Sequence, residues 1–262
     1  MKACVLNKVH SPLVMEERPD LDPQPDEVVV ELKAASLNRR DYWITQGMYP
    51  GIEPPVVLGS DGAGVVRQTG RELGNYWVGR EVIINPALGW GENQAAQASD
   101  FSILGLPTDG TFATEVIVPA TQLNLKPEHL SWEEAAALPL AGLTAYRAVF
   151  PQGGLNSGEK LLITGIGGGV ATFALQYGVA AGAEVWVTSS SDDKIRRAIE
   201  YGAAGGFNYK DDGWSKAMSE KAGQPHLIID SAGGSGYRDL LNLCASGGRI
   251  VNYGATAGPP EK

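Results

Sequence analysis

A glycine-rich turn in the second half of the chain has the composition of a phosphate-binding loop. It runs Gly165-Ile-Gly-Gly-Gly-Val-Ala171, between an apolar run and a segment of helical composition. Glycines let the backbone turn tightly and approach a pyrophosphate, and the following helix offers free N–H groups and the positive end of its dipole. The turn is not a clean G-x-G-x-x-G, but it fits G-x-x-G-x-x-A. It predicts a dinucleotide site and hence redox chemistry. The residues assigned to the pyrophosphate are Gly165, Gly168, Gly169 and Val170.

The end of the next apolar run favours a phosphorylated dinucleotide. An NAD site presents Asp or Glu there to bind the ribose 2′-hydroxyl, whereas this run ends in the hydroxyl side chains of residues 188–191. Ser189, Ser190 and Lys194 suit a 2′-phosphate, since each hydrogen bond to a charged group contributes roughly 1.5–3 kcal/mol. Asp192 and Asp193 oppose this reading, because a carboxylate would repel the phosphate. The serines also suit the cap of the next helix, and the two roles are compatible. The expected cofactor is NADPH.

Strand-like and helix-like segments alternate around these motifs. Apolar runs of strand length at Lys160–Thr164 and Ala183–Thr188 flank a helix predicted over Thr172–Ala181. This βαβ order, continued by later strands, predicts an α/β fold with a doubly wound parallel sheet. The later strands are predicted at residues 206–209, 226–230 and 248–253.

Two other interpretations of this segment stay open at the sequence level. Leu161–Ala183 carries no charge and is long enough to span a membrane. Its glycines, and the change from strand to helix pattern, argue against a span. The turn could also be purely structural and bind no ligand.

Composition narrows the class of protein. The 262 residues are enough for two domains, and the net charge of −9 disfavours nucleic acid and anionic membranes as partners. Cys4 and Cys244 are far apart, so neither a disulfide framework nor a redox C-x-x-C is predicted. The N-terminal residues lack the long apolar core of a signal peptide, and we expect a cytoplasmic protein.

The texture of the sequence changes near residue 123. The preceding part is rich in glycine, proline and short β-branched runs, which indicates an irregular all-β domain with a long loop at Asn85–Gly110. Further on, Ser131 and Glu134 form a predicted capping box that begins a helix. We therefore predict one domain over residues 1–123 and a dinucleotide-binding domain over 124–262. The four runs assigned to strands of the first domain are residues 28–32, 62–66, 81–84 and 113–118.

Several motifs in order along the chain resemble one family. The chain is similar to the medium-chain dehydrogenases/reductases, in their zinc-independent branch of quinone-oxidoreductase-like proteins. The resemblance implies a GroES-like β domain followed by a Rossmann domain. The matching segments, besides the glycine turn, are Ala35-Ser-Leu-Asn-Arg-Arg-Asp-Tyr42, Gly47-Met-Tyr-Pro50, Pro55-Val-Val-Leu-Gly-Ser-Asp-Gly-Ala-Gly64, Gly110-Thr-Phe-Ala-Thr-Glu115, residues 136–146 and Gly205-Gly-Phe-Asn-Tyr209.

The resemblance also identifies where zinc-dependent relatives hold their metal. In those relatives the ligands are Cys, His and Cys, at positions where this chain has Asn38, Ser60 and Leu140. A catalytic zinc needs three protein ligands drawn from Cys, His and carboxylate. We therefore expect no metal, and hydride transfer to an activated acceptor such as a quinone, an enone or an enoyl thioester.

The remaining site residues follow from the resemblance, which implies a cleft between the domains. Tyr49 is the first choice for a hydrogen-bond donor to the acceptor, and in the alternative it only lines the pocket while solvent delivers the proton. Asn38 is assigned to the catalytic site, although it and Asp41 could serve only to stabilise their loop. The cofactor residues implied by the resemblance are Thr144, Tyr209, Ser231, Gly233, Tyr253 and Gly254.

Two matters stay open at this stage. The family continues beyond the strand at 248–253 with a sixth strand that commonly forms a homodimer, so the chain is expected to be shortened at its C-terminus, with its activity and dimerisation in doubt. A relative without catalytic activity, or a zinc alcohol dehydrogenase, is the alternative function. The sequence does not distinguish between the acceptors.

Overall fold

The computed structural model describes residues 1–260 and forms two compact units that divide between Leu140 and Ala141. The predicted division at 123/124 lies earlier, because the segment after residue 123 packs on the first unit. Ala135 and Ala136 of its helix are buried against Ala63. Residues 261–262 of the predicted second domain lie outside the described part.

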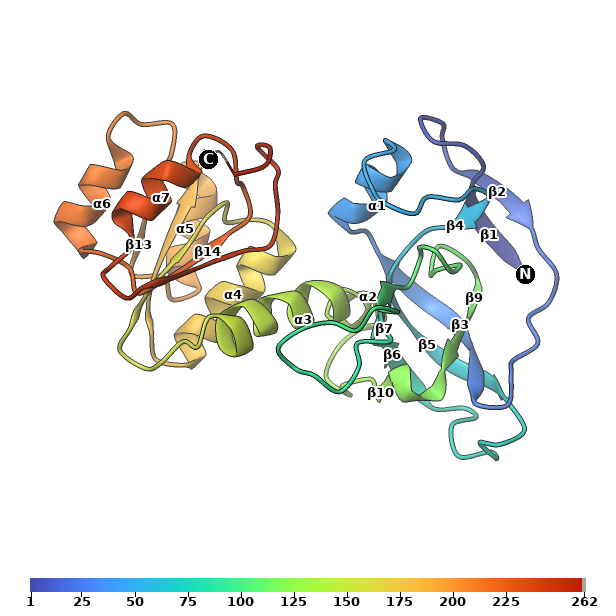
Figure 1. Cartoon of the computed structure of the whole chain (residues 1–262). Coiled ribbons are helices and arrows are strands. Elements are labelled where there is room, and N and C mark those ends of the chain that lie inside the picture. The colour runs from blue at the N-terminus through green and yellow to red at the C-terminus, as the bar shows by residue number, and fades with distance from the viewer. Residues whose placement is uncertain (261–262) are drawn as a thin grey trace. The chain divides into compact units, whose positions relative to one another are not determined.

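The first unit consists of two antiparallel sheets, a short strand pair and few helices (Figure 1). The sheet orders are β10-β6-β5-β3-β9 and β2-β1-β4, and β7 pairs with β8. Its strands are β1 (Lys2–Leu6), β2 (Val14–Glu17), β3 (Glu27–Ser36), β4 (Val56–Val57), β5 (Asp61–Thr69), β6 (Glu81–Ile84), β7 (Ala87–Leu88), β8 (Ser102–Ile103), β9 (Glu115–Pro119) and β10 (Leu123–Leu125). Its helices are α1 (Arg39–Thr45), the 3₁₀ turn η1 (Ala120–Gln122) and α2 (Trp132–Ala136).

Alternating apolar residues form the core of the larger sheet. Val28 and Val30 of β3 face Val116 and Val118 of β9 within one buried cluster, as the two-residue period of a strand requires. The four predicted strands are confirmed. The hairpin β1–β2 was not predicted, and the loop at 85–110 contains the short pair β7–β8.

The predicted capping box at the start of α2 is confirmed. The Ser131 hydroxyl accepts from the Glu134 N–H at 3.2 Å, and the Glu134 carboxylate accepts from the Ser131 N–H at 2.9 Å. Each side chain satisfies an N–H group that the helix itself cannot pair.

The second unit is a parallel sheet of order β13-β12-β11-β14-β15. The predicted α/β doubly wound fold is confirmed, and every predicted strand is present. Helix α4 begins at Gly169, earlier than the predicted Thr172, because the last glycines of the turn already form its first residues. The elements are α3 (Pro139–Arg147), which contains the division between the units, the π turn η2 (Ala148–Gln152), β11 (Lys160–Ile163), α4 (Gly169–Ala180), β12 (Glu184–Ser189), α5 (Asp192–Glu200), β13 (Gly205–Asn208), α6 (Trp214–Ala222), β14 (Leu227–Asp230), α7 (Tyr237–Leu243) and β15 (Arg249–Asn252).

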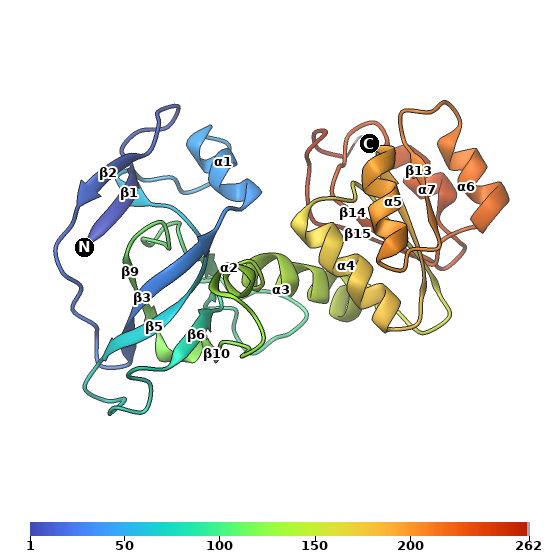
Figure 2. The same ribbon diagram turned by 180° about the vertical axis from the view of Figure 1, so that it is seen from behind.

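Helices cover both faces of this sheet, which explains why its strands are continuously apolar. Leu161 and Ile163 of β11 pack with α4 and α5 on one face, while Leu162 packs with α6 and α7 on the other. Figure 2 shows α4 and α5 on the near side, and Figure 1 shows the side of α6 and α7.

The uncharged segment 161–183 does not form a membrane span. It folds into β11, the glycine turn and the twelve-residue α4. Among the described residues, no helix has the length and hydropathy needed to cross a bilayer.

Candidate functional site

The glycine turn between β11 and α4 has the geometry of a phosphate cradle. Gly165 and Gly167 adopt φ values of +66° and +109°, which side chains disfavour. A Cβ on Gly165 would lie 2.7 Å from the Ser231 hydroxyl oxygen, so the backbone passes close to the end of β14. Gly168 caps α4 without a side-chain hydrogen bond. The first N–H groups of α4 are thus available to an anion.

The strand ends beside this turn are organised by a buried carboxylate. Asp230 is fully buried, and its oxygens accept from the Thr164 hydroxyl at 2.6 Å and from the Gly233 N–H at 3.0 Å. They also accept from the Ala232 N–H at 3.1 Å and from the Asn252 side-chain amide at 2.8 Å. Asp230 therefore ties the carboxyl ends of β11, β14 and β15 together.

The predicted residues at these strand ends lie close to one another. Ser231 donates its N–H to the Thr164 hydroxyl at 3.0 Å, and a Cβ on Gly254 would lie 2.8 Å from the Ser231 carbonyl oxygen. Gly233 has a φ of +63°. Burial, partly opposed by a hydrogen bond to Ser231, raises the pKa of Tyr253 to about 12, so its hydroxyl keeps its proton at neutral pH. The structure brings Ser231, Gly233 and Gly254 to the edge of the sheet that carries the glycine turn.

Lys194 lies across the glycine turn. A Cβ on Gly167 would be 2.7 Å from Cδ and 3.3 Å from Nζ of Lys194, so the side chain of α5 reaches back over the loop. Among the described residues this ammonium group has no hydrogen bond or ion pair. It is a free positive charge at the turn.

The hydroxyls at the end of β12 are arranged differently from a helix cap. Ser191 is the N-cap residue of α5, but its side chain makes no capping hydrogen bond. The Ser189 hydroxyl instead accepts from the Ser191 N–H at 3.2 Å, and Ser190 is exposed. The Ser189 carbonyl accepts from the N–H of Tyr209, whose side chain is about half exposed.

The two acidic residues that opposed a phosphate have partners of their own. Asp192 accepts from the Asn208 side-chain amide at 3.1 Å, and Asp193 pairs with Arg196 one turn along α5. Each carboxylate therefore interacts with a neighbouring side chain of the protein.

Thr144 is the one predicted cofactor residue from α3. Ala141, one turn earlier on that helix, packs against the start of α4. A Cβ placed on Gly169 would lie 3.2 Å from the Cβ of Ala141. Residues three apart share a helix face, so the half-buried Thr144 is on the side of α3 that faces α4.

In the first unit, Asn38 is held by a buried aspartate. Its side-chain amide donates to Asp61 at 2.9 Å, and the other Asp61 oxygen accepts from the Leu140 N–H at 2.8 Å. The Asn38 backbone N–H donates to Asp41 at 2.7 Å. Burial raises the pKa of Asp61 to about 6, against the opposing effect of these two donors. Sequence reasoning treated Asp61 only as part of a motif and missed this role.

Tyr49 is in contact with a buried arginine. Arg40 of α1 is 8% exposed, and its Cζ lies 5.2 Å from the centre of the Tyr49 ring. The Arg40 Nη1 donates to the Ser60 hydroxyl at 2.6 Å and to the Leu104 carbonyl at 3.0 Å. Arg40 thus contacts both Ser60 and Tyr49, and Asp61, which follows Ser60 in the chain, binds Asn38. We call these five residues the polar cluster of the first unit.

The three positions that would supply zinc ligands hold no set of metal donors. Asn38 and the Leu140 N–H both bond to Asp61, and the Ser60 hydroxyl bonds to Arg40 and Leu104. Across residues 1–260, no group of three or more His, Cys, Asp or Glu side chains is placed to hold a metal ion. A zinc ion does not fit this arrangement.

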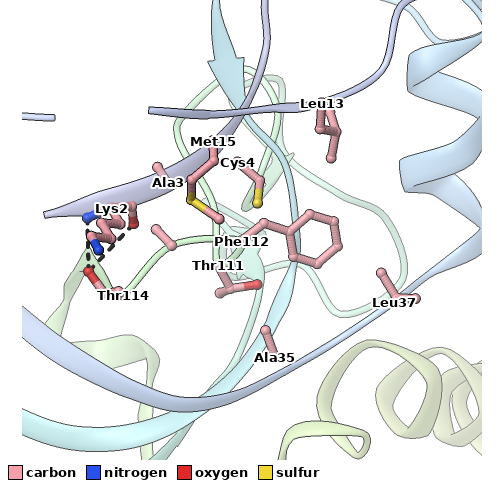
Figure 3. A pocket seen from close by; sticks show the side chains of 11 residues that line it. Lys2, Ala3, Cys4, Leu13, Met15, Ala35, Leu37, Thr111, Phe112 and Thr114 are labelled. Atoms are coloured by element: carbon pink, nitrogen blue, oxygen red, sulfur yellow. Dashed lines mark hydrogen bonds between the residues drawn. The ribbon is translucent and has the colours of Figure 1, made fainter. Parts of the chain in front are cut away.

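A separate groove of about 510 Å³ is open on the first unit (Figure 3). Figure 3 shows Leu13, Met15, Leu37 and Phe112 around it, with Lys2 and Thr114 together at one end. The groove offers hydrocarbon contact and few donors, and neither Asn38 nor Tyr49 is among the residues that line it.

The raised pKa of Asp61 makes a prediction about stability. Its pKa is about 6 in the folded protein and near 3.8 when unfolded, so the fold favours the protonated form. The stabilisation is complete below pH 3.8 and disappears as pH rises through 6, which amounts to about 3 kcal/mol. We expect the free energy of unfolding of the wild type, minus that of Asp61→Asn, to fall by this amount between pH 3 and 7 in urea titrations. A difference that does not vary with pH would contradict the assignment.

Known proteins resemble both units. Residues 24–128 match the family described as alcohol dehydrogenase GroES-like domain, and residues 169–262 match the family described as zinc-binding dehydrogenase. A zinc-type alcohol dehydrogenase-like protein, YogA, from Leptosphaeria maculans is 39% identical, over 96% of this chain and 75% of the relative. An acryloyl-coenzyme A reductase from Sulfurisphaera tokodaii is 30% identical, over 97% of this chain and 77% of the relative.

A solved structure agrees with this result. The crystal structure of an NAD-dependent alcohol dehydrogenase superposes with a TM-score of 0.93 at 36% identity, covering 99% of this chain and 79% of the other. The chain thus spans about three quarters of each of these proteins. From its fold, its glycine turn and these matches, the chain belongs to the medium-chain dehydrogenase/reductase superfamily.

Proposed function

We propose that this protein is an NADPH-dependent oxidoreductase that reduces an activated acceptor, a quinone, an enone or an enoyl thioester, without zinc. The observation that carries the proposal is Lys194, which lies over the glycine turn as a free cation, in the helix that follows β12 and its hydroxyls at Ser189 and Ser190. A 2′-phosphate needs such a cation and such hydroxyls, while the 2′-hydroxyl of NADH needs a carboxylate that β12 does not present.

The cofactor residues form a site in the second unit. When bound, NADPH would supply the hydride for reduction of the acceptor. The first N–H groups of α4, at Gly169 and Val170, would bind the pyrophosphate, while Ser231 and Gly254 would position the nicotinamide end. Tyr209, half exposed beside Ser189, would pack over the adenosine phosphate.

In the first unit, Tyr49 would donate a hydrogen bond to the acceptor oxygen. Asn38 has committed its amide N–H to Asp61, so we assign it to holding the loop and the cluster in shape. The relative named acryloyl-coenzyme A reductase is named for an enoyl thioester, which supports this acceptor class. The relatives named as zinc-type or NAD-dependent dehydrogenases favour two alternatives, a zinc-dependent mechanism and NADH as the cofactor. The two experiments below would detect them.

The first experiment measures cofactor choice. In fluorescence titrations we expect NADPH to bind more tightly than NADH, and Lys194→Ala to raise the Kd of NADPH by about 10- to 100-fold, the loss of one charged hydrogen bond. The Kd of NADH should not change. Lys216→Ala, on the exposed surface of α6, is the matched control.

Two outcomes would contradict the proposal. Equal affinity for NADH and NADPH in the wild type would show that the protein does not recognise the 2′-phosphate. An equal loss for both cofactors in Lys194→Ala would place this lysine at the pyrophosphate that they share.

The second experiment measures metal content. We expect protein purified from zinc-supplemented culture to contain far less than one zinc per chain, and its turnover to be unaffected by a chelator, because three ligands are not available. One tightly bound zinc per chain, with activity lost on its removal, would overturn the zinc-free mechanism.

A further inference from the structure

Arg40 is a buried cation without a carboxylate in contact. It is 8% exposed, and its hydrogen-bond acceptors are neutral: the Ser60 hydroxyl and the Leu104 carbonyl. Its Nε is buried and has no partner. Within residues 1–260, Arg40 forms no ion pair. A buried charge is costly to leave uncompensated, so its retention needs an explanation.

The two carboxylates that act on Arg40 through space make no hydrogen bond to it. Asp61 accepts from Asn38 and from the Leu140 N–H, and Asp41 accepts from the Asn38 N–H. Arg40 influences both only through space. Its guanidinium also lies over the ring of Tyr49, with Cζ 5.2 Å from the ring centre.

A guanidinium over a tyrosine ring attracts the negative face of the ring, and the attraction is larger when water is excluded. Negative charge that develops on the phenol oxygen would be stabilised by the same cation. Because Ser60 and Leu104 hold Nη1 of Arg40 in place, the charge needs no reorganisation at the moment of reaction.

We propose that Arg40 is the positioning residue for Tyr49, holding its ring and stabilising its hydroxyl as it donates to the reduced acceptor. This inference rests on the proposed function. Bound NADPH would supply a hydride to the acceptor carbon and leave as NADP⁺, so that the acceptor would gain an electron pair. The proton of the Tyr49 hydroxyl then forms a bond to the acceptor, its O–H electron pair stays on the phenol oxygen, and water returns a proton to it. The positive charge of Arg40 would stabilise the phenol oxygen of Tyr49 until that oxygen is protonated again.

The chain offers a matched control for this pair. Arg80 lies over Tyr76 with its Cζ 4.1 Å from the ring centre, but the Tyr76 side chain is exposed and outside the polar cluster. Solvent screens a charge at such a site, so Arg80→Gln should leave turnover unchanged.

The test is a double-mutant cycle with NADPH and a quinone acceptor, or an enone where the quinone is not reduced. We expect Arg40→Gln to lower kcat by about 10- to 30-fold, with the KM for NADPH unchanged, and Arg40→Lys to restore part of the loss. In a Tyr49→Phe background, Arg40→Gln should have little further effect, since both changes remove one function. Thermal unfolding checks that each variant is folded, and Arg40→Lys takes the place of Arg40→Gln in the cycle if the latter does not fold.

The outcomes separate this inference from the proposed function. Equal falls in kcat with and without the Tyr49 hydroxyl would show that Arg40 acts structurally and would overturn the inference alone. Unchanged kcat in Arg40→Gln would do the same. A wild type that binds NADPH but reduces neither acceptor class would overturn the proposed function, and this inference with it.

Discussion

A carboxylate removed from water must find hydrogen-bond donors inside the fold, and the functional loops of both units depend on this constraint. Asp230 satisfies it with four donors from the ends of three parallel strands. The loop after β14 has no regular structure to fix it, and two of those donors are its own N–H groups. One buried side chain therefore fixes the start of this loop to the ends of the neighbouring strands.

The buried carboxylate of Asp61 has fewer hydrogen-bond donors than that of Asp230. It has two donors, from Asn38 and Leu140, and the nearby charge of Asp41 opposes its ionisation. Its raised pKa is the physical sign that desolvation exceeds the gain from those donors. The two hydrogen bonds of Asp61 have a structural effect, because they fix the loop of Asn38 to the start of α3. Positions that would carry metal ligands in zinc-dependent relatives are thus linked by hydrogen bonds instead.

The sequence allowed much of this architecture to be predicted. Apolar runs such as Lys160–Thr164 are continuous because both faces of a parallel sheet are covered, and the capping box at Ser131 is a local pattern. The hairpin β1–β2 was not predicted, because half of Val14–Glu17 is charged and the segment is largely exposed. Lys194 was assigned to the phosphate from its position after β12, but its path over Gly167 depends on the packing of α5 and cannot be derived from spacing. The partners of Asp61 and Asp230 lie far away in sequence, so a buried aspartate after an apolar run was the one available signal.

Membership of a superfamily and possession of its chemistry depend on different residues. The matches to the two families cover residues 24–128 and 169–262, which include most strands of the first unit and the helices and strands from α4 onward. Zinc chemistry depends on three side chains, and here they are Asn38, Ser60 and Leu140. Three positions are a small part of the chain, so its overall identity to a relative hardly depends on whether they carry metal donors. The polar cluster of Asn38, Arg40, Tyr49, Ser60 and Asp61 is therefore a better guide to the mechanism than the names of similar proteins, and Arg40 is its buried cation.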